Sequence, residues 1–231
     1  MGDIFGPPRE DPAAAVQRLV HDSAFDEVEL IVLSGLELCT SGVDRQALFD
    51  PAVAAAWRSL PDRARDSALR EISASFVFRR LMRIVPQTGK VEHAPELNIL
   101  RDARTDPAFA LTAAFDGSDG RGLRMFGFGE AVVIESPVAA PGRRRDVQRM
   151  GPLGWLFRYT LASKPIAADV LVKWTRPALP RKAKGRVIMA FRRGQDRAEV
   201  VAISRRGKAT RNGVPLDAGT LDDVVSGLVR N

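Results

Sequence analysis

The chain of 231 residues is 45% hydrophobic and 27% charged, the ordinary balance of a soluble globular protein. This length is enough to bury a sizeable core, in one large domain or two small ones. The single cysteine, Cys39, excludes an internal disulfide and fits a reducing compartment.

The net charge of +7 is distributed unevenly along the chain. Residues 1–142 carry 15 Lys and Arg against 21 Asp and Glu, whereas residues 143–231 carry 20 against 7. A cationic second part suggests an anionic partner, such as nucleic acid, an acidic protein face or lipid headgroups. Arginine-rich solvated surfaces would explain the same numbers, and the sequence does not separate the two explanations.

Two observations bear on localisation. Residues 1–11 lack a basic region followed by an apolar run, so no signal peptide is expected. The most apolar window, residues 152–172, contains Arg158, Lys164 and Asp169 and is therefore a poor membrane span. We expect a cytoplasmic protein with no membrane span.

The first part of the chain is predicted to be helical. A lead-in over residues 1–25 contains a first helix that begins at Asp11. A second helix is predicted over residues 27–39 from its closely spaced apolar residues, and a third, short one over residues 52–59 after Asp50-Pro51.

Residues 62–83 are predicted to form a long helix, because Pro61 and Pro86 bound it and apolar residues recur at helical spacing. Its buried stripe would consist of Leu69, Ile72, Phe76 and Leu81. The turn residues 86–89 would then join two short strands, with a further helix over residues 95–104.

Helix, short helix, long helix and hairpin over residues 26–95 form the pattern of a winged-helix unit. A nucleic-acid-binding protein of this kind would use the basic end of the long helix and the basic C-terminal part. The candidate residues are Arg79, Arg80, Arg83, Lys90, Arg143, Arg144, Arg145, Lys182, Lys184 and Arg186. The arginines that end the long helix also suit its macrodipole, which is a structural reason for their presence.

From Ala108 onward the apolar periodicity becomes that of strands. Strands are predicted over residues 109–115, 123–128, 131–136, 186–193, 198–204 and 208–211, with a further strand or exposed edge over residues 143–149. Residues 152–172 are predicted to be helical with an interruption at Lys164-Pro165, and a last helix is expected over residues 220–229.

The predicted fold class is therefore α+β. A helical, winged-helix-like unit over residues 26–95 would pack on a sheet region over residues 96–231, in one compact domain overall. The antiparallel sheet would be contributed by two segments, residues 108–149 and 186–211, with helices between and after them.

No combination of residues indicates catalysis. The two histidines, His21 and His93, are far apart in the sequence, and a zinc site would have to draw most ligands from carboxylates. No Gly-x-Ser-x-Gly motif marks a nucleophilic serine. We therefore expect a protein that is not an enzyme and that needs no cofactor or metal.

Several segments resemble a known family in their order and spacing. They are Phe78-Arg79-Arg80-Leu81, Val91-Glu92, Pro95-Glu96-Leu97, Asp106 to Phe115, Gly185-Arg186-Val187, Val200-Val201-Ala202-Ile203 and Leu221 to Val229. In these segments the chain resembles the EspG family, cytosolic chaperones of type VII (ESX) secretion in actinobacteria. The resemblance implies a non-enzymatic chaperone or adaptor that shields the apolar tip of a helical secretion substrate.

Such a chaperone would hold its partner with its sheet and its C-terminal helical face. The candidate partner-binding residues are Met125, Phe126, Phe128, Val132, Ile134, Trp155 and Leu156. Each of these residues could instead belong to the core, whereas a partner site should be a contiguous exposed apolar patch. A nucleic-acid-binding protein and an assembly subunit that uses the same sheet edge remain alternatives.

Overall fold

The computed structural model describes residues 27–40, 51–116, 122–138 and 151–230. Its elements form a large antiparallel sheet, a small two-stranded sheet and several helices, which confirms the predicted α+β class. The predicted helix from Asp11 and the predicted strand or edge over residues 143–149 lie outside the described residues.

The described chain divides into two compact units. The first contains residues 31–40, 51–105 and 151–156, and the second contains residues 27–30, 106–116, 122–138 and 157–230. The helix that begins at Pro95 groups with the first unit, whereas the predicted sheet region over residues 96–231 included most of this helix.

The first unit is mainly helical. Its elements are α2 (Gly35–Thr40), α3 (Pro51–Ser59), α4 (Asp62–Phe78), β2 (Met82–Ile84), β3 (Val91–His93), α5 (Pro95–Thr105) and the 3-10 helix η2 (Gly151–Gly154). Helices α2, α3 and η2 contact one another, and α4 contacts α2. The buried side chains of this unit include Leu38, Val53, Ile72, Phe76 and Leu153.

The predicted helix over residues 27–39 is wrong in its first two thirds. Residues Glu27–Ser34 form strand β1, and only Gly35–Thr40 is helical. Ile31 and Leu33 are buried, whereas the residues that alternate with them are half-buried, in keeping with the two-residue period of a pleated backbone, and β-branched residues favour it. Helix α2 begins where Ser34 and Glu37 form a capping box: Glu37 N donates to Ser34 Oγ at 3.1 Å, and Ser34 N donates to Glu37 Oε2 at 2.7 Å.

Helix α4 ends at Phe78, about one turn earlier than predicted. Leu81 N donates to the Phe76 carbonyl at 2.8 Å and Arg80 N donates to the Val77 carbonyl at 3.0 Å, the two bonds of a Schellman motif. Arg80 adopts the left-handed conformation (φ 58°) that glycine usually supplies, so the sequence carried no glycine to mark the stop.

The hairpin after α4 matches its prediction. Strands β2 and β3 pair antiparallel, with Ile84 opposite Val91. Val85 N donates to the Lys90 carbonyl at 2.8 Å, and Gly89 takes the positive φ (65°) that closes the turn.

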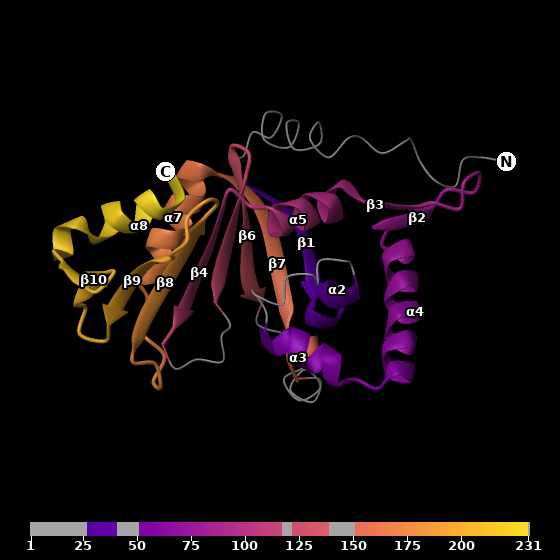
Figure 1. Cartoon of the computed structure of the whole chain (residues 1–231), viewed down its shortest axis with the longest axis horizontal. Helices are drawn as coiled ribbons and strands as arrows, with labels where there is room; N and C mark the ends of the chain where they lie inside the picture. The colour runs from indigo at the N-terminus through magenta and orange to yellow at the C-terminus, as the bar shows by residue number, and fades with distance from the viewer. Residues whose placement is uncertain (1–26, 41–50, 117–121, 139–150, 231) are drawn as a thin grey trace. The chain divides into compact units, whose positions relative to one another are not determined.

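The second unit is built on a nine-stranded sheet in the order β1-β7-β6-β5-β4-β8-β9-β10-β11 (Figure 1). Its further elements are β4 (Phe109–Phe115), β5 (Leu123–Phe128), β6 (Ala131–Val138), β7 (Leu156–Ser163), α7 (Lys164–Thr175), β8 (Gly185–Arg192), β9 (Glu199–Ser204), β10 (Ala209–Arg211), β11 (Val214–Leu216), the 3-10 helix η3 (Ala218–Thr220) and α8 (Leu221–Arg230). The pairs β4–β5, β5–β6, β4–β8, β8–β9, β9–β10 and β10–β11 are antiparallel.

The prediction of a helix from residue 152 is also wrong. Residues Leu156–Ser163 form strand β7, and the helix starts only at Lys164. Pro165 stands in the first turn of α7, where its missing N–H is harmless, so it begins this helix and does not interrupt a longer one.

One face of the sheet is covered by helices of the same unit. Helices α7 and α8 contact each other, and both bury apolar residues against β4, β5, β6, β8 and β9 (Figure 1). This core includes Leu111, Met125, Leu171, Ile188 and Leu228. Among the described helices, none combines the length and the apolar character that a membrane crossing requires.

Candidate partner-binding face

The seven candidate apolar residues do not form one exposed surface. Met125, Phe126, Val132 and Ile134 are buried, with at most 4% of their surface exposed. Phe128, Trp155 and Leu156 are half-buried. The first four are therefore core residues, and a partner could not reach their side chains in this structure.

The basic residues at the end of α4 are engaged by the first unit itself. Arg79 Nη1 donates to Glu37 Oε1 at 2.7 Å, and its Nη2 donates to the Val32 carbonyl at 2.9 Å. Arg83 forms an ion pair with Glu92 at 2.6 Å across the hairpin. Arg80 and Lys90 are exposed. Two of the arginines thus have structural partners that would compete with a phosphate.

The candidate basic residues further along the chain differ from one another. Arg143, Arg144 and Arg145 lie outside the described residues, and Lys182 and Lys184 are exposed.

Arg186 is buried against two aromatic rings. Its guanidinium lies 5.6 Å from the ring centre of Phe115 and 5.8 Å from that of Trp174, and it donates to the Pro177 carbonyl. Phe115 and Trp174 stack on each other with ring centres 5.3 Å apart. Burial lowers the pKa of Arg186 from its usual value, but arginine stays charged at ordinary pH. Arg186 therefore ties β8 to α7 through cation–π contacts and is no surface ligand.

Within the described residues, no group of three or more His, Cys, Asp and Glu is placed to hold a metal ion. Cys39 is buried and His93 is half-buried. His21 lies outside the described residues.

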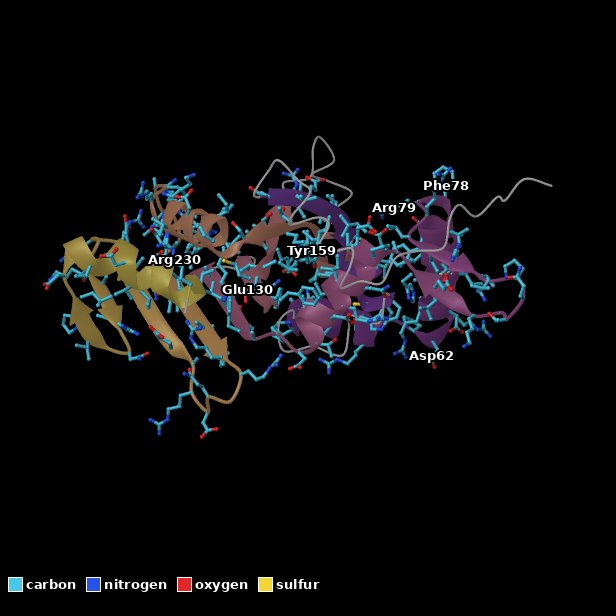
Figure 2. All side chains as sticks on the ribbon, turned by 90° about the horizontal axis from the view of Figure 1, so that it is seen from above. Asp62, Phe78, Arg79, Glu130, Tyr159 and Arg230 are labelled. Carbon is cyan, nitrogen blue, oxygen red and sulfur yellow. The ribbon has the colours of Figure 1, made fainter. Side chains whose placement is uncertain are left out.

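The most polar feature inside the second unit is a buried ion pair. Arg124 on β5 donates to Glu135 on β6, the residue directly opposite it, and the Tyr159 hydroxyl on β7 donates to the other carboxylate oxygen at 2.8 Å. All three side chains are buried, and Figure 2 shows Tyr159 among packed side chains. Such a cluster fixes the register of three neighbouring strands, because a shifted strand would leave a charge buried without its partner.

On the sheet face opposite α7 and α8, several described residues of β4, β8 and β9 are exposed or half-buried. Directly opposed residues of antiparallel strands point to the same side. Thr112, Met189 and Val200 form one row across the three strands, and Ala114, Val187 and Ala202 form a second. Phe191 follows on β8, and none of these residues belongs to the core under the helices. We call the set Thr112, Ala114, Val187, Met189, Phe191, Val200 and Ala202 the β8 face.

The β8 face is apolar and accessible. Met189 is 38% exposed and Phe191 is 50% exposed, and the five other members are half-buried. None of the seven carries a charge, because the arginines of β8, Arg186 and Arg192, stand on the side of the helices. An uncharged surface with an exposed phenylalanine and methionine is unusual for a sheet face that meets only water.

The signal for this face was present in the sequence. The run Val187-Ile188-Met189-Ala190-Phe191 is apolar at every position, which is typical of a strand covered on both sides. In the structure Ile188 and Ala190 are buried in the core, while the alternate residues Met189 and Phe191 are exposed. The apolar run predicts the strand, but by itself it does not show what covers the second side of that strand.

The exposed apolar residues of the first unit are less clustered than those of the β8 face. Leu69, Val77 and Phe78 on α4 are exposed, as are Ile84 and Val91 in the hairpin. Phe78, 90% exposed, projects outward from the end of the helix (Figure 2). Leu69 and Phe78 are separated by about 180° around the helix axis, so they do not share a face.

Comparisons with known proteins add no assignment: no family model matches this chain, and no curated protein or solved structure is significantly similar to it.

Proposed function

We propose that this chain is a non-enzymatic adaptor or chaperone that holds a helical segment of a protein partner on the β8 face. The observation that carries the proposal is the asymmetry of strand β8. One side is buried under two helices of the same unit, and the other is equally apolar but exposed.

A helix is the natural occupant of such a face. Sheets are commonly covered by helices that bury one apolar stripe, and α7 and α8 do this on the first side. A partner helix on the second side would complete a helix–sheet–helix sandwich. Exposed Met189 and Phe191 would then be buried in the contact, where aromatic residues and methionine are enriched and a few well-packed side chains contribute most of the binding energy.

The narrower form of the proposal is that the partner is a substrate of type VII secretion. Its support is the resemblance in order and spacing to the EspG family described in the sequence analysis. The proposal of a partner-binding face stands on the geometry of the second unit and does not depend on that resemblance.

The winged-helix, nucleic-acid-binding alternative has less support. Helix α4 and the hairpin follow one another as that reading requires, but Arg79 and Arg83 are held by Glu37 and Glu92. A helix laid in a groove of DNA needs its basic side chains available to phosphates.

The test is affinity purification of the tagged chain from a cell that expresses it naturally, in three forms. We compare the wild type with Phe191→Asp, which places a charge on the β8 face. The matched control is Val214→Asp, which places the same charge on an exposed apolar residue of β11. Circular dichroism establishes that all three are folded.

The wild type and Val214→Asp should recover the same helical protein, and Phe191→Asp should not. Equal recovery by both variants would contradict the proposal. Recovery of nucleic acid without any helical protein would favour the alternative.

A further inference from the structure

We propose that the helix held on the β8 face carries a cluster of acidic residues at one end, which binds a basic cluster beside the N-terminal end of β8. This inference rests on the proposed function and adds the chemistry of the partner. The basic cluster consists of Arg181, Lys182, Lys184, Arg205, Arg206 and Lys208.

Two segments about twenty residues apart meet to form this cluster. Arg205 N donates to the Lys184 carbonyl at 3.0 Å, and Arg205 Nη1 donates to the carbonyls of Arg181 and Ala183 at 3.1 and 3.3 Å. Ser204 N donates to the Lys208 carbonyl at 2.8 Å and closes the turn between β9 and β10. These bonds fix the loop before β8 against the turn after β9, and all six cationic side chains are exposed.

Few carboxylates of the described residues lie close to these cations. None of the six forms an ion pair with a carboxylate among the described residues. Backbone pairing brings acidic residues to the same end. Lys184 N donates to the Asp116 carbonyl at 3.2 Å, and Asp116 N donates to the Gly185 carbonyl at 2.9 Å. Asp217 follows Leu216, the residue opposite Ala209, and so lies beside Lys208. Among the described residues, these six positive charges outnumber the carboxylates that backbone pairing brings to this end, and an excess of cations attracts anions.

The opposite end of the same strands is different. There Arg193 pairs with Asp106 at 3.0 Å and Arg211 pairs with Glu199 at 2.7 Å. Arg192 donates to the Leu228 carbonyl at 3.0 Å, at the C-terminal end of α8, where a cation suits the helix dipole. The unbalanced charge therefore belongs to one end of the sheet and is not a general property of its arginines.

The β8 face extends from the basic end of these strands to their opposite end. Its row of Ala114, Val187 and Ala202 lies next to Gly185, where the basic loop ends, and Phe191 lies at the far end. Val187 and Phe191 are separated by about 13 Å along the strand, the length of about nine residues of helix. A helix that lies along β8 and continues by one turn beyond Val187 would bring its last side chains to the basic cluster.

Nucleic acid fits this surface less well than an acidic helix does. A single strand of nucleic acid needs aromatic rings for its bases beside the cations that hold its phosphates. On the β8 face the one aromatic residue, Phe191, stands at the end away from the cluster, and Val187 and Met189 offer no ring for stacking. A helix with an apolar stripe and acidic residues at one end matches both the β8 face and the basic cluster.

The probe is a library displayed on a helical-bundle scaffold. One exposed helix carries a fixed apolar stripe, and its flanking positions vary among Glu, Gln and Lys. The library is selected against the full chain and against two variants with four substitutions each. The cluster variant carries Lys182→Gln, Lys184→Gln, Arg206→Gln and Lys208→Gln, and it keeps Arg205 because that side chain holds the loop.

The control variant has the same net charge as the cluster variant. It carries Arg63→Gln, Arg70→Gln, Arg197→Gln and Arg230→Gln, all at exposed positions outside the two segments that form the cluster. Wild type and control should enrich helices with Glu at one end, and the cluster variant should not. A Glu-ended binder should bind the cluster variant about tenfold more weakly than the control, with a difference that shrinks as salt rises.

Any other outcome of the selection contradicts either the acidic end of the partner helix or both proposals. Binders that depend on Phe191 but carry no acidic end would refute the acidic end of the partner helix. Helices with an acidic end that are also selected by the cluster variant would refute it too. In both cases the proposal of the β8 face stands. If binders are indifferent to Phe191→Asp, or if no helix is enriched over background, both proposals fail. If a single-stranded oligothymidine binds the wild type and not the cluster variant, and helices do not, the cluster is a nucleic-acid site.

Discussion

Phe76 and Phe78 lie two residues apart on α4 and meet opposite environments. Phe76 is 3% exposed and Phe78 is 90% exposed. Replacement of Phe76 by Ala should lower the free energy of unfolding by about 3–5 kcal/mol, because it removes a buried ring and leaves a cavity. Phe78→Ala should change it by less than about 0.5 kcal/mol.

Denaturant unfolding of the two variants, followed by far-ultraviolet circular dichroism, provides the comparison. Equal effects of the two substitutions would mean that α4 is rotated relative to the structure.

Glu135 provides a second test on a single side chain. Glu135→Gln should destabilise the protein by about 3–5 kcal/mol, because it leaves the buried guanidinium of Arg124 without its counter-charge. The exposed pair of Arg158 and Glu29 is the control, since Glu29→Gln should cost less than about 1 kcal/mol. Both values come from denaturant midpoints, and a mild effect of Glu135→Gln would show that water reaches the cluster.

At the scale of the element, strand β8 should respond in opposite ways on its two sides. Ile188→Asp places a charge in the core under α7 and α8 and should abolish cooperative unfolding. Met189→Asp, one residue later on the open side, should cost less than about 1 kcal/mol in the absence of a partner. Thermal unfolding by circular dichroism distinguishes the two, and a collapse of both variants would place the β8 face inside the fold.

The sequence predicted best those elements whose ends carry their own signals. Strands β4 and β5 have the predicted bounds, and α5 begins at Pro95 as expected. Strands β1 and β7 were read as helices because dense apolar runs satisfy both periods. The local signals that decide between them, Ser34 with Glu37 and Pro165 in a first turn, lie at the ends of the strands.

The β8 face could be predicted only in part for a physical reason. Strand periodicity shows that Met189 and Phe191 share a side, but which side α7 and α8 cover depends on tertiary packing. The same limit applies to Met125 and Phe126, which are completely buried in the folded chain. The basic cluster needs the contact of the segments around Lys184 and Arg205, which no local pattern encodes.

At the scale of the whole molecule, clustering of charge should matter more than its sum. The cluster variant and the control variant defined above have equal net charge. The cluster variant should nevertheless elute from heparin at lower salt, because adjacent cations bind a polyanion together. Substitution of Arg143, Arg144 and Arg145 by Gln shows by the same measurement whether that triplet contributes. Equal elution of the cluster and control variants would mean that the basic cluster is only a solvated surface.

The position of the partner on the β8 face is tested most directly by oxidative footprinting of the methionines, read by mass spectrometry. Met189 is exposed and should oxidise readily in the free protein, whereas Met125 is fully buried and should resist. With the helical partner bound, oxidation of Met189 and of Phe191 should fall several-fold, and that of Met125 should stay low. Undiminished oxidation of Met189 in a complex that is otherwise intact would contradict the proposed site.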